Sequence, residues 1–327
     1  MRHFIFYLMA VLLPFSVLLA SCKKETESEP KVTINAIGFY SSFFLAGYGS
    51  VTIDWGDRTK IETHTLKSYD QNSPHGGFYS HDYYLGDLLD VHTITLTGKG
   101  ITYFESSSGI TSLDLNSINT LVYLYCLGIR GQTSLDLSNN TSLYTLEWNG
   151  ILTSLDISKN FALRTLDCSV NKLTSLDLSN NTMLENLYCQ NNQLTNLDVS
   201  RNTELRSYYC YQNQLTNLDV SRNTSLNSLD CSYNLLTSLD LSANTGLRYF
   251  TCNNNQLTSL NMSNNTAIII LECSSNNLTT EALDALFETL HDNTPIWYSK
   301  RIIIGNNPGA ADCDRSIATD KGWIVDD

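Results

Sequence analysis

The amino-acid sequence predicts a β-rich solenoid, a right-handed parallel β superhelix with 21-residue turns, between an N-terminal β-sandwich-like domain and a C-terminal α/β cap. Six cysteines recur every 21 residues, leucines keep fixed places around them, and the flanking residues lack this repeat. Self-similarity at a fixed period is the signature of a repeat architecture. The expected segments are a signal peptide (1–21), a lipid anchor and tether (22–30), a small β domain (31–100), the solenoid (101–280) and the cap (281–327).

Composition and charge narrow the classes of function. Of 327 residues, 42% are hydrophobic, which is enough for a folded core and excludes a disordered chain. Lys and Arg total 20 against 33 Asp and Glu, so the net charge is −13. Because nucleic-acid phosphates attract cationic proteins, we expect no nucleic-acid partner.

The first 21 residues have the pattern of a secretory signal peptide. Arg2 and His3 precede an apolar run over residues 4–20, which is short for a membrane-spanning helix. The following Leu19-Ala20-Ser21-Cys22 resembles the lipobox of bacterial lipoproteins. This resemblance implies thioether lipidation of Cys22 and cleavage just before it. An ordinary cleaved signal peptide with a free cysteine is the alternative.

Residues 22–30 are expected to form the lipid anchor and a tether. Residues 23–30 are charged and polar, so they bury nothing and favour a flexible linker. Position 23 is Lys rather than Asp, and in lipoproteins of Gram-negative bacteria this implies sorting to the outer membrane. We therefore expect a lipid-anchored outer-membrane protein. Exposure at the cell surface is the first expectation for its orientation, and a periplasmic orientation is the alternative.

Residues 31–100 are expected to form a small β domain. Strand-like runs lie at 32–36, 50–55 and 92–97. Asp54-Trp55-Gly56-Asp57, with the later Ser80-His81-Asp82-Tyr83, resembles the signatures of PKD-like immunoglobulin sandwiches, although Arg58 stands where that family has glycine. A zinc cluster of the histidines at 64, 75, 81 and 92 is an alternative, but they lack close ligand spacing and we expect no metal.

The solenoid segment repeats one unit. It reads Leu184-x-x-Leu187-x-Cys189-x-x-Asn192-x-Leu194, then Leu197-Asp198-Val199, and it restarts at Leu205. Leu187 and Cys189 alternate with period two, so they point inward from a short strand while residues 186, 188 and 190 point outward. This is the pattern of a leucine-rich repeat, in which each turn adds one strand to a parallel sheet. The repeated cysteines are Cys168, Cys189, Cys210, Cys231, Cys252 and Cys273, and the repeated asparagines are Asn171, Asn192, Asn213, Asn234, Asn255 and Asn276.

The cysteines are expected to be reduced and buried. Neighbouring parallel strands hold their Cβ atoms about 4.8 Å apart, beyond the usual disulfide range of about 3.5 to 4.5 Å. No histidine lies between residues 92 and 291, so no such base is at hand to activate a thiol. Upstream, Trp148 takes a cysteine position and residues 104–115 form a degenerate first turn, so the array should hold about nine turns.

A column of acids stands on the opposite wall, between the inward residues of each Leu-Asp-Leu-Ser segment. Because carboxylates stacked about 5 Å apart repel, we expect them to be solvated or bonded to backbone donors. A calcium-binding ladder is the alternative, but one carboxylate per turn without a glycine-rich loop does not favour it. The column is Asp114, Asp136, Asp156, Asp177, Asp198, Asp219 and Asp240, and Asn261 breaks it.

With these columns, residues 101–280 resemble internalin-type leucine-rich repeats with a cysteine ladder, which occur in surface proteins of Gram-positive pathogens and in lipoproteins of Bacteroidetes. The resemblance implies a solenoid fold. It implies adhesion, partner capture and scaffolding equally well.

The last segment is expected to cap the solenoid, because a terminal turn otherwise exposes its apolar core. Residues 280–290 have apolar side chains at helical spacing behind a Thr-rich start, which predicts a helix. A buried strand at 301–304 and a short helix within 313–322 should follow, before an apolar end at 323–325. Cys313 is interpreted as a packed cap residue rather than a reactive or metal site.

The outward strand positions, on the expected concave face, are the candidate partner-binding site. Exposed aromatic side chains offer large contact area and are common anchors of protein interfaces and of glycan sites. A tyrosine ladder that only stabilises its own sheet is the alternative. The candidates are Tyr123, Tyr125, Glu147, Asp167, Tyr188, Tyr209, Tyr211, Asp230, Tyr233 and Tyr249.

The function expected from these features is binding of a macromolecular partner, a protein in the first place, by a lipid-anchored envelope protein. Capture of a glycan beside an outer-membrane importer is the alternative, and a purely structural role is a further one. An enzyme would need an acid, a base or a nucleophile that converge in one pocket, whereas this sequence places its acids in rows. No catalytic residue, metal or cofactor is expected.

Overall fold

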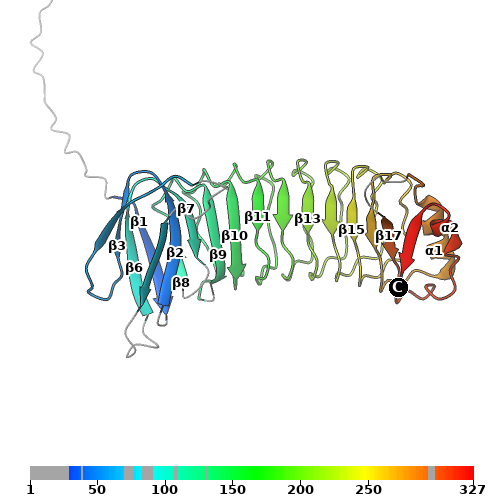
Figure 1. Ribbon diagram of the computed structural model, residues 1–327, viewed down its shortest axis with the longest axis horizontal. Coiled ribbons are helices and arrows are strands. Elements are labelled where there is room, and N and C mark those ends of the chain that lie inside the picture. The colour runs from blue at the N-terminus through cyan, green and yellow to red at the C-terminus, as the bar shows by residue number, and fades with distance from the viewer. Residues whose placement is uncertain are drawn as a thin grey trace, which may run out of the picture.

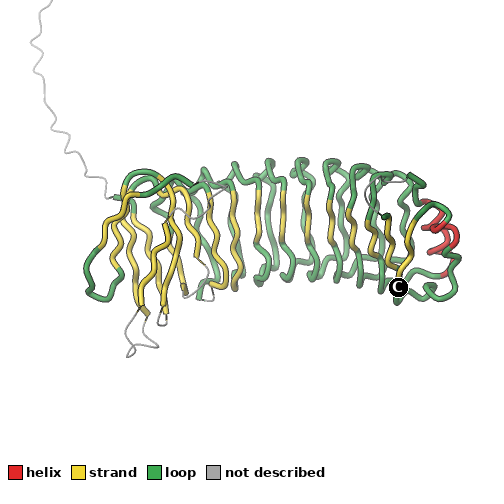
Figure 2. The backbone as a smooth tube through the Cα atoms, in the orientation of Figure 1, coloured by secondary structure: helices red, strands yellow, loops and turns green. Residues whose placement is uncertain are grey.

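The computed structural model describes residues 29–37, 40–69, 77–82, 91–106, 110–129, 131–293 and 299–327. The strands stand side by side along an elongated molecule, from a sandwich at the N-terminal end to two helices at the C-terminal end (Figures 1 and 2). The expected signal peptide and the lipidation site Cys22 lie outside the described residues.

The elements follow the chain as a long series of strands with two late helices. The N-terminal strands are β1 (Lys31–Ile37), β2 (Tyr40–Gly47), β3 (Ser50–Asp54), β4 (Glu62–Thr65), β5 (Gly77–Asp82), β6 (Val91–Gly98), β7 (Ile101–Ser106) and β8 (Ile110–Asp114). The repeat strands are β9 (Tyr123–Ile129), β10 (Thr145–Gly150), β11 (Thr165–Asp167), β12 (Asn186–Tyr188), β13 (Ser207–Tyr209), β14 (Ser228–Asp230), β15 (Tyr249–Thr251) and β16 (Ile270–Glu272). The C-terminal elements are α1 (Thr280–Thr289), β17 (Lys300–Ile303), α2 (Ser316–Thr319) and β18 (Trp323–Asp326).

A five-stranded antiparallel sheet, in the order β4-β3-β6-β1-β8, forms one layer of the N-terminal domain. Alternate residues of β1 are buried, among them Val32 and Ile34, as expected for a sheet with one face on a core. Strand β8 lies beyond the expected domain boundary at residue 100 and pairs with β1. The sandwich therefore also uses residues from the segment assigned to the solenoid.

The second layer is continuous with the repeats. Strand β7 pairs antiparallel with β2 and parallel with β9, so a single 13-stranded sheet runs from β5 to β18. Phe43 stacks on Trp55 of the other layer at 5.5 Å between ring centroids, and on Phe104 of the first parallel strand at 5.9 Å. This aromatic core ties the N-terminal domain to the solenoid.

The Asp54–Asp57 segment forms a tight turn. The Oδ1 atom of Asp54 accepts a hydrogen bond from the Gly56 amide at 2.9 Å. Gly56 has φ = 77°, and a Cβ atom there would lie 2.3 Å from the carbonyl oxygen of Thr93. Arg58 also has a positive φ of 68°. The arginine thus occupies a left-handed position that favours glycine.

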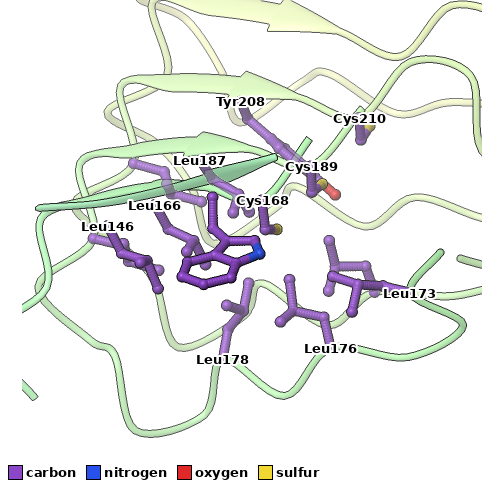
Figure 3. Packing of buried hydrophobic residues seen from close by; sticks show 14 of the residues in the cluster. Leu146, Leu166, Cys168, Leu173, Leu176, Leu178, Leu187, Cys189, Tyr208 and Cys210 are labelled. Carbon is purple, nitrogen blue, oxygen red and sulfur yellow. The ribbon is translucent and has the colours of Figure 1, made fainter. Parts of the chain in front are cut away.

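The repeats form a β-solenoid of about 10 turns of roughly 21 residues. The solenoid and its turn length agree with the sequence prediction, whereas the number of turns is larger than the nine expected. Successive strands pair in register, so that Leu166, Leu187 and Tyr208 are adjacent across three strands. Figure 3 shows this inward file beside the cysteine file of Cys168, Cys189 and Cys210. Leucines of the opposite wall close the core from the other side.

The described cysteines of the repeats are buried and form no disulfide bonds, in agreement with the expectation of buried thiols. Each has no exposed surface and behaves as a small apolar side chain. Trp148 takes the cysteine place on β10 opposite Cys126, and it too is fully buried. The indole is accommodated where the repeat spacing departs from 21.

Two files of buried asparagines hold successive turns together. In the predicted file, Asn213 accepts a hydrogen bond from the Leu194 amide and donates to the carbonyl oxygens of Cys189 and Cys210, all at 3.0 Å. The second file, not predicted from the sequence, lies at the other bend of each turn and donates to two carbonyl oxygens of the turn before. Its members are Asn140, Asn160, Asn181, Asn202, Asn223, Asn244 and Asn265.

The C-terminal segment continues the sheet and then covers its end. Strands β17 and β18 pair in parallel beyond β16. Helix α1 begins behind Thr279, whose side chain accepts a hydrogen bond from the Ala282 amide, and it buries Leu283, Leu286 and Phe287. Lys300 is fully buried, and its Nζ atom donates to two backbone carbonyl oxygens. Neither described helix has the length and apolar character needed to cross a membrane.

Candidate binding surface

The outward side chains of the parallel strands form one surface, here called the strand face. Its middle row, here called the central file, is aligned by the strand register, with one residue from β7 and one from each of the strands β9 to β16. All nine side chains are half-buried, because their neighbours on adjacent strands cover their flanks. The central file is Glu105, Tyr125, Glu147, Asp167, Tyr188, Tyr209, Asp230, Thr251 and Glu272.

Most of the predicted binding residues lie on the strand face. Tyr125, Glu147, Asp167, Tyr188, Tyr209 and Asp230 belong to the central file. Tyr123 and Tyr249 lie two residues earlier on their strands, and Tyr211 lies just past the end of β13. Tyr233 is different, since it follows the strand in a left-handed conformation (φ = 52°) and is 53% exposed at the bend. The structure therefore brings nine of the ten together and places Tyr233 at the rim.

Tyr188 and Tyr209 form an edge-to-face pair in the middle of the file. Their ring centroids are 5.2 Å apart. The Tyr209 hydroxyl is 3.0 Å from Oγ of Ser228, so part of its polar capacity is already used within the sheet. The pair stabilises its own strands and still presents ring surface outward.

A larger aromatic cluster covers the N-terminal end of the strand face. Tyr69 stacks on Tyr103 and makes a tilted contact with Tyr123, with both centroid distances at 4.6 Å. Tyr103 also contacts Tyr125 at 5.4 Å, and Tyr123 contacts Tyr144 at 6.0 Å. A depression of about 500 Å³ beside the cluster is lined by Gly47, Tyr48, Ser68, Tyr69, Thr102, Val122 and Tyr123.

Sequence reasoning missed Tyr69, Tyr103 and Tyr144. Tyr69 comes from a loop of the N-terminal domain, and only the tertiary fold brings it over the first repeat strands. Tyr144 had a usable signal, because it stands in register with Arg164, Glu185 and Arg206 one position before each strand. Arg164 lies over the Tyr144 ring at 5.8 Å.

The acids of the central file are partly desolvated. Burial raises the pKa of Glu147, and the neighbouring charges of Asp167 and Glu105 raise it further. Burial also raises the pKa of Asp230, although hydrogen bonds from Ser232 oppose this effect. Among the described ion pairs, none involves Glu147, Asp167, Asp230 or Glu272. These four carboxylates of the central file therefore have no cationic partner among the described ion pairs.

A second depression, of about 450 Å³, lies over strands β13 to β16. Its lining combines carboxylates, tyrosine rings and small polar side chains. The residues are Tyr209, Asn227, Ser228, Leu229, Asp230, Tyr249, Thr251, Ile270 and Glu272.

The acids of the opposite wall behave differently. Asp136, Asp156 and Asp177 line a larger depression of about 670 Å³. Each accepts a hydrogen bond from the amide of the serine two residues on, and these bonds lower its pKa. Within the described ranges, no group of three or more His, Cys, Asp or Glu side chains could hold a metal ion. The wall thus uses its acids to cap the turns, which was the expectation for this column.

The described thiols are not suited to nucleophilic chemistry. Burial raises the pKa of Cys210 and of Cys273 to about 12, so both remain protonated at neutral pH. Cys313 is partly exposed, and burial raises its pKa as well, while Arg315 opposes the shift.

The stacked strands, the buried cysteine file and the asparagine files define a leucine-rich-repeat solenoid with a cysteine ladder. Its fold is similar to that of the functional domain of InlJ from Listeria monocytogenes, which includes a cysteine ladder, with a TM-score of 0.55 and 26% identity over 73% of this chain and 56% of that one. A leucine-rich-repeat protein from Leptospira interrogans shares the fold, with a TM-score of 0.51 and 22% identity over 65% of this chain and 61% of that one.

The chain spans less than two thirds of the length of both solved structures. No family model and no curated protein matches it. The structural likeness therefore concerns the solenoid architecture.

Proposed function

We propose that this chain is a non-catalytic, lipid-anchored protein of the outer membrane, exposed at the cell surface, that binds a protein partner through the strand face. The observation that carries this proposal is the central file, where half-buried tyrosines stand among carboxylates that have no described cationic partner. Aromatic rings held by neighbouring strands lose little entropy on binding, and partly desolvated charges give specificity. The anchor part rests on the sequence around Cys22.

The binding part is tested with the full-length chain on arrays of purified surface proteins and of glycans. The Tyr188→Ala/Tyr209→Ala variant is compared with Met183→Ala/Phe161→Ala, which removes exposed apolar side chains outside the strand face. We expect a protein hit that the tyrosine variant loses and the control keeps. Equal binding by both variants, or a tyrosine variant that is only less stable, would leave the tyrosines with a structural role and overturn the proposal.

A glycan is the second candidate partner, and one observation favours it. The depression beside Tyr69 and Tyr123 combines aromatic rings with the hydroxyls of Ser68 and Thr102, and Tyr48 at its edge is 60% exposed. Sugar rings stack on such surfaces while hydroxyls bond their polar groups. A glycan hit that Tyr48→Ala loses and Tyr188→Ala/Tyr209→Ala keeps would assign this depression instead of the central file.

The anchor is tested by fractionation. We expect the wild-type chain in the outer-membrane fraction, accessible to protease on intact cells, and Cys22→Ser in the soluble fraction. A Cys22→Ser variant that still fractionates with the membrane would contradict lipid anchoring.

A further inference from the structure

We propose that the strand face recognises a cationic polypeptide segment, with one Lys or Arg side chain held in the depression between Asp230 and Glu272. This inference rests on the proposed function and specifies the chemistry of the partner. Four features of the depression lead to it. They are the spacing of the two carboxylates, their existing hydrogen bonds, the aromatic rings beside them, and the ion pairs that the neighbouring arginines make with other acids.

The two carboxylates flank a gap of suitable width. Asp230 is on β14 and Glu272 on β16, with the smaller Thr251 between them in the central file. Two strand spacings separate the backbones by about 10 Å. The short threonine leaves the depression of about 450 Å³ open between the acids. A guanidinium or ammonium group placed there lies within reach of both carboxylates.

The existing hydrogen bonds orient the acids without neutralising them. Oδ1 of Asp230 accepts bonds from the amide and the hydroxyl of Ser232, at 3.0 and 2.6 Å. Oε2 of Glu272 accepts a bond from Nδ2 of Asn253 at 3.1 Å. All of these donors are neutral, so they add no positive charge beside the two carboxylates. Preorganised carboxylates lose less entropy on pairing than free side chains do.

Tyrosine rings supply the second half of a cation site. Tyr209 and Tyr249 line the depression on two sides, and Tyr249 is 40% exposed. The face of an aromatic ring attracts a guanidinium or ammonium group, most strongly where water is partly excluded. Carboxylates and rings together favour a cationic side chain over a neutral one.

Three arginines beside the strand face are already engaged with other acids. Arg164 and Arg206 both pair with Glu185, which lies before β12 and outside the central file. At the C-terminal end, Arg301 pairs with Asp326 at 3.1 Å. Arg248, one position before β15, is exposed and makes none of the described ion pairs. No described ion pair reaches Asp230 or Glu272 either, so both carboxylates are free to pair with a cationic group of a partner.

The repeat spacing suggests the form of that partner. In a polyproline-type extended segment, residues i and i+3 point to the same side and are about 9.3 Å apart. This distance matches two strand spacings of the sheet, so successive basic side chains of such a segment meet every second position of the central file. Glu147 and Asp167, farther along the central file, offer a second acidic pair to the same segment. A segment with a basic residue at every third position fits the file best.

The test uses two labelled dodecapeptides, Arg-Pro-Thr repeated four times and the same peptide with citrulline, the neutral isostere of arginine. Binding to the full-length chain is measured by fluorescence anisotropy. The test variant is Asp230→Asn/Glu272→Gln, in which the amides can still accept the bonds from Ser232 and Asn253. The control is Asp198→Asn/Asp240→Asn on the opposite wall, which removes the same charge and where Asn261 already fills the equivalent place.

We expect the arginine peptide to bind the wild type and the control alike, and to bind the test variant at least about tenfold more weakly. The citrulline peptide should bind none of them measurably. An equal loss of arginine-peptide binding in both double variants would mean nonspecific electrostatic attraction. Equal binding of the arginine and citrulline peptides would mean that recognition does not depend on the positive charge. Either result overturns the inference. If the arginine peptide fails to bind while the arrays give a hit that depends on Tyr188 and Tyr209, the inference fails and the proposed function stands.

Discussion

At the scale of single residues, the bend after each strand requires a left-handed backbone. Val170, Asn191, Gln212, Tyr233, Asn254 and Ser275 have φ between 52° and 56° in successive turns. Asparagine tolerates this region, whereas a β-branched residue is strained there. Val170 is 56% exposed, so burial does not compensate the strain.

We therefore expect Val170→Asn to raise the free energy of unfolding by about 1 kcal/mol. Asn191→Val, the reverse change one turn later, should lower it by a similar amount. Both values come from urea unfolding. Stabilisation by Asn191→Val would show that the bend tolerates a branched side chain without strain.

The asparagine three residues after each repeated cysteine also stabilises the individual turns. Replacing Asn213 by Leu leaves the buried Leu194 amide without its acceptor and removes one donor from each of two cysteine carbonyls. We expect the free energy of unfolding to fall by about 3 kcal/mol. Asn227→Ala, at an exposed position, is the control and should change it by less than about 0.5 kcal/mol. A similar small effect for Asn213→Leu would contradict the role assigned to this file.

At the scale of elements, the two walls of the solenoid respond to pH with opposite signs. The folded state raises the pKa of Glu147 above its ordinary value of 4.5, so it holds this proton more tightly than the unfolded chain does. The stabilisation is present at low pH and is lost as pH rises through the folded pKa. The opposite wall lowers the pKa of Asp198, so its contribution is present above 3.8 and is lost as pH falls through the folded pKa.

Glu147→Gln is therefore expected to be more stable than the wild type at pH 7, because the variant has no charge to desolvate. The advantage should vanish below about pH 4.5, where the wild-type carboxyl is protonated. Thermal unfolding between pH 3.5 and 8 measures the difference, and Asp198→Asn should show the opposite sign at pH 7. A Glu147→Gln variant that is less stable at pH 7 would mean that the ionised carboxylate has a stabilising partner.

At the scale of the whole molecule, each turn contacts only its neighbours, so stability is close to a sum over repeats. Deleting residues 191–211 removes one whole turn and joins equivalent positions of two repeats. We expect this variant to fold, with an unchanged circular dichroism signal per residue and a lower Tm. Deleting residues 191–200 removes half a turn, and this control should lose cooperative unfolding. Failure of the whole-turn variant to fold would show that the N-terminal sandwich and the cap must be a fixed distance apart.

The sequence predicted those features of the fold that depend on contacts between neighbouring repeats. The sequence predicted the cysteine and asparagine files because every repeat makes the same contacts with its neighbours and therefore keeps the same residue at these positions. The second asparagine file was present in the same repeat and was overlooked, although Asn202 and its equivalents recur as regularly as Asn192 does. The left-handed bend was not predicted, since Val, Asn, Gln, Tyr and Ser share no propensity that marks it.

The sequence by itself determined the solenoid, its turn length, its buried cysteine file and the outward positions of the central file. These properties depend on strand periodicity and on contacts that repeat every turn. Only the tertiary structure decided that β8 returns to β1, that Tyr69 covers the first repeat strands and that Asp230 and Glu272 share one depression. Such contacts join residues far apart in the chain, or depend on which side chains between them are small, and no local pattern encodes them.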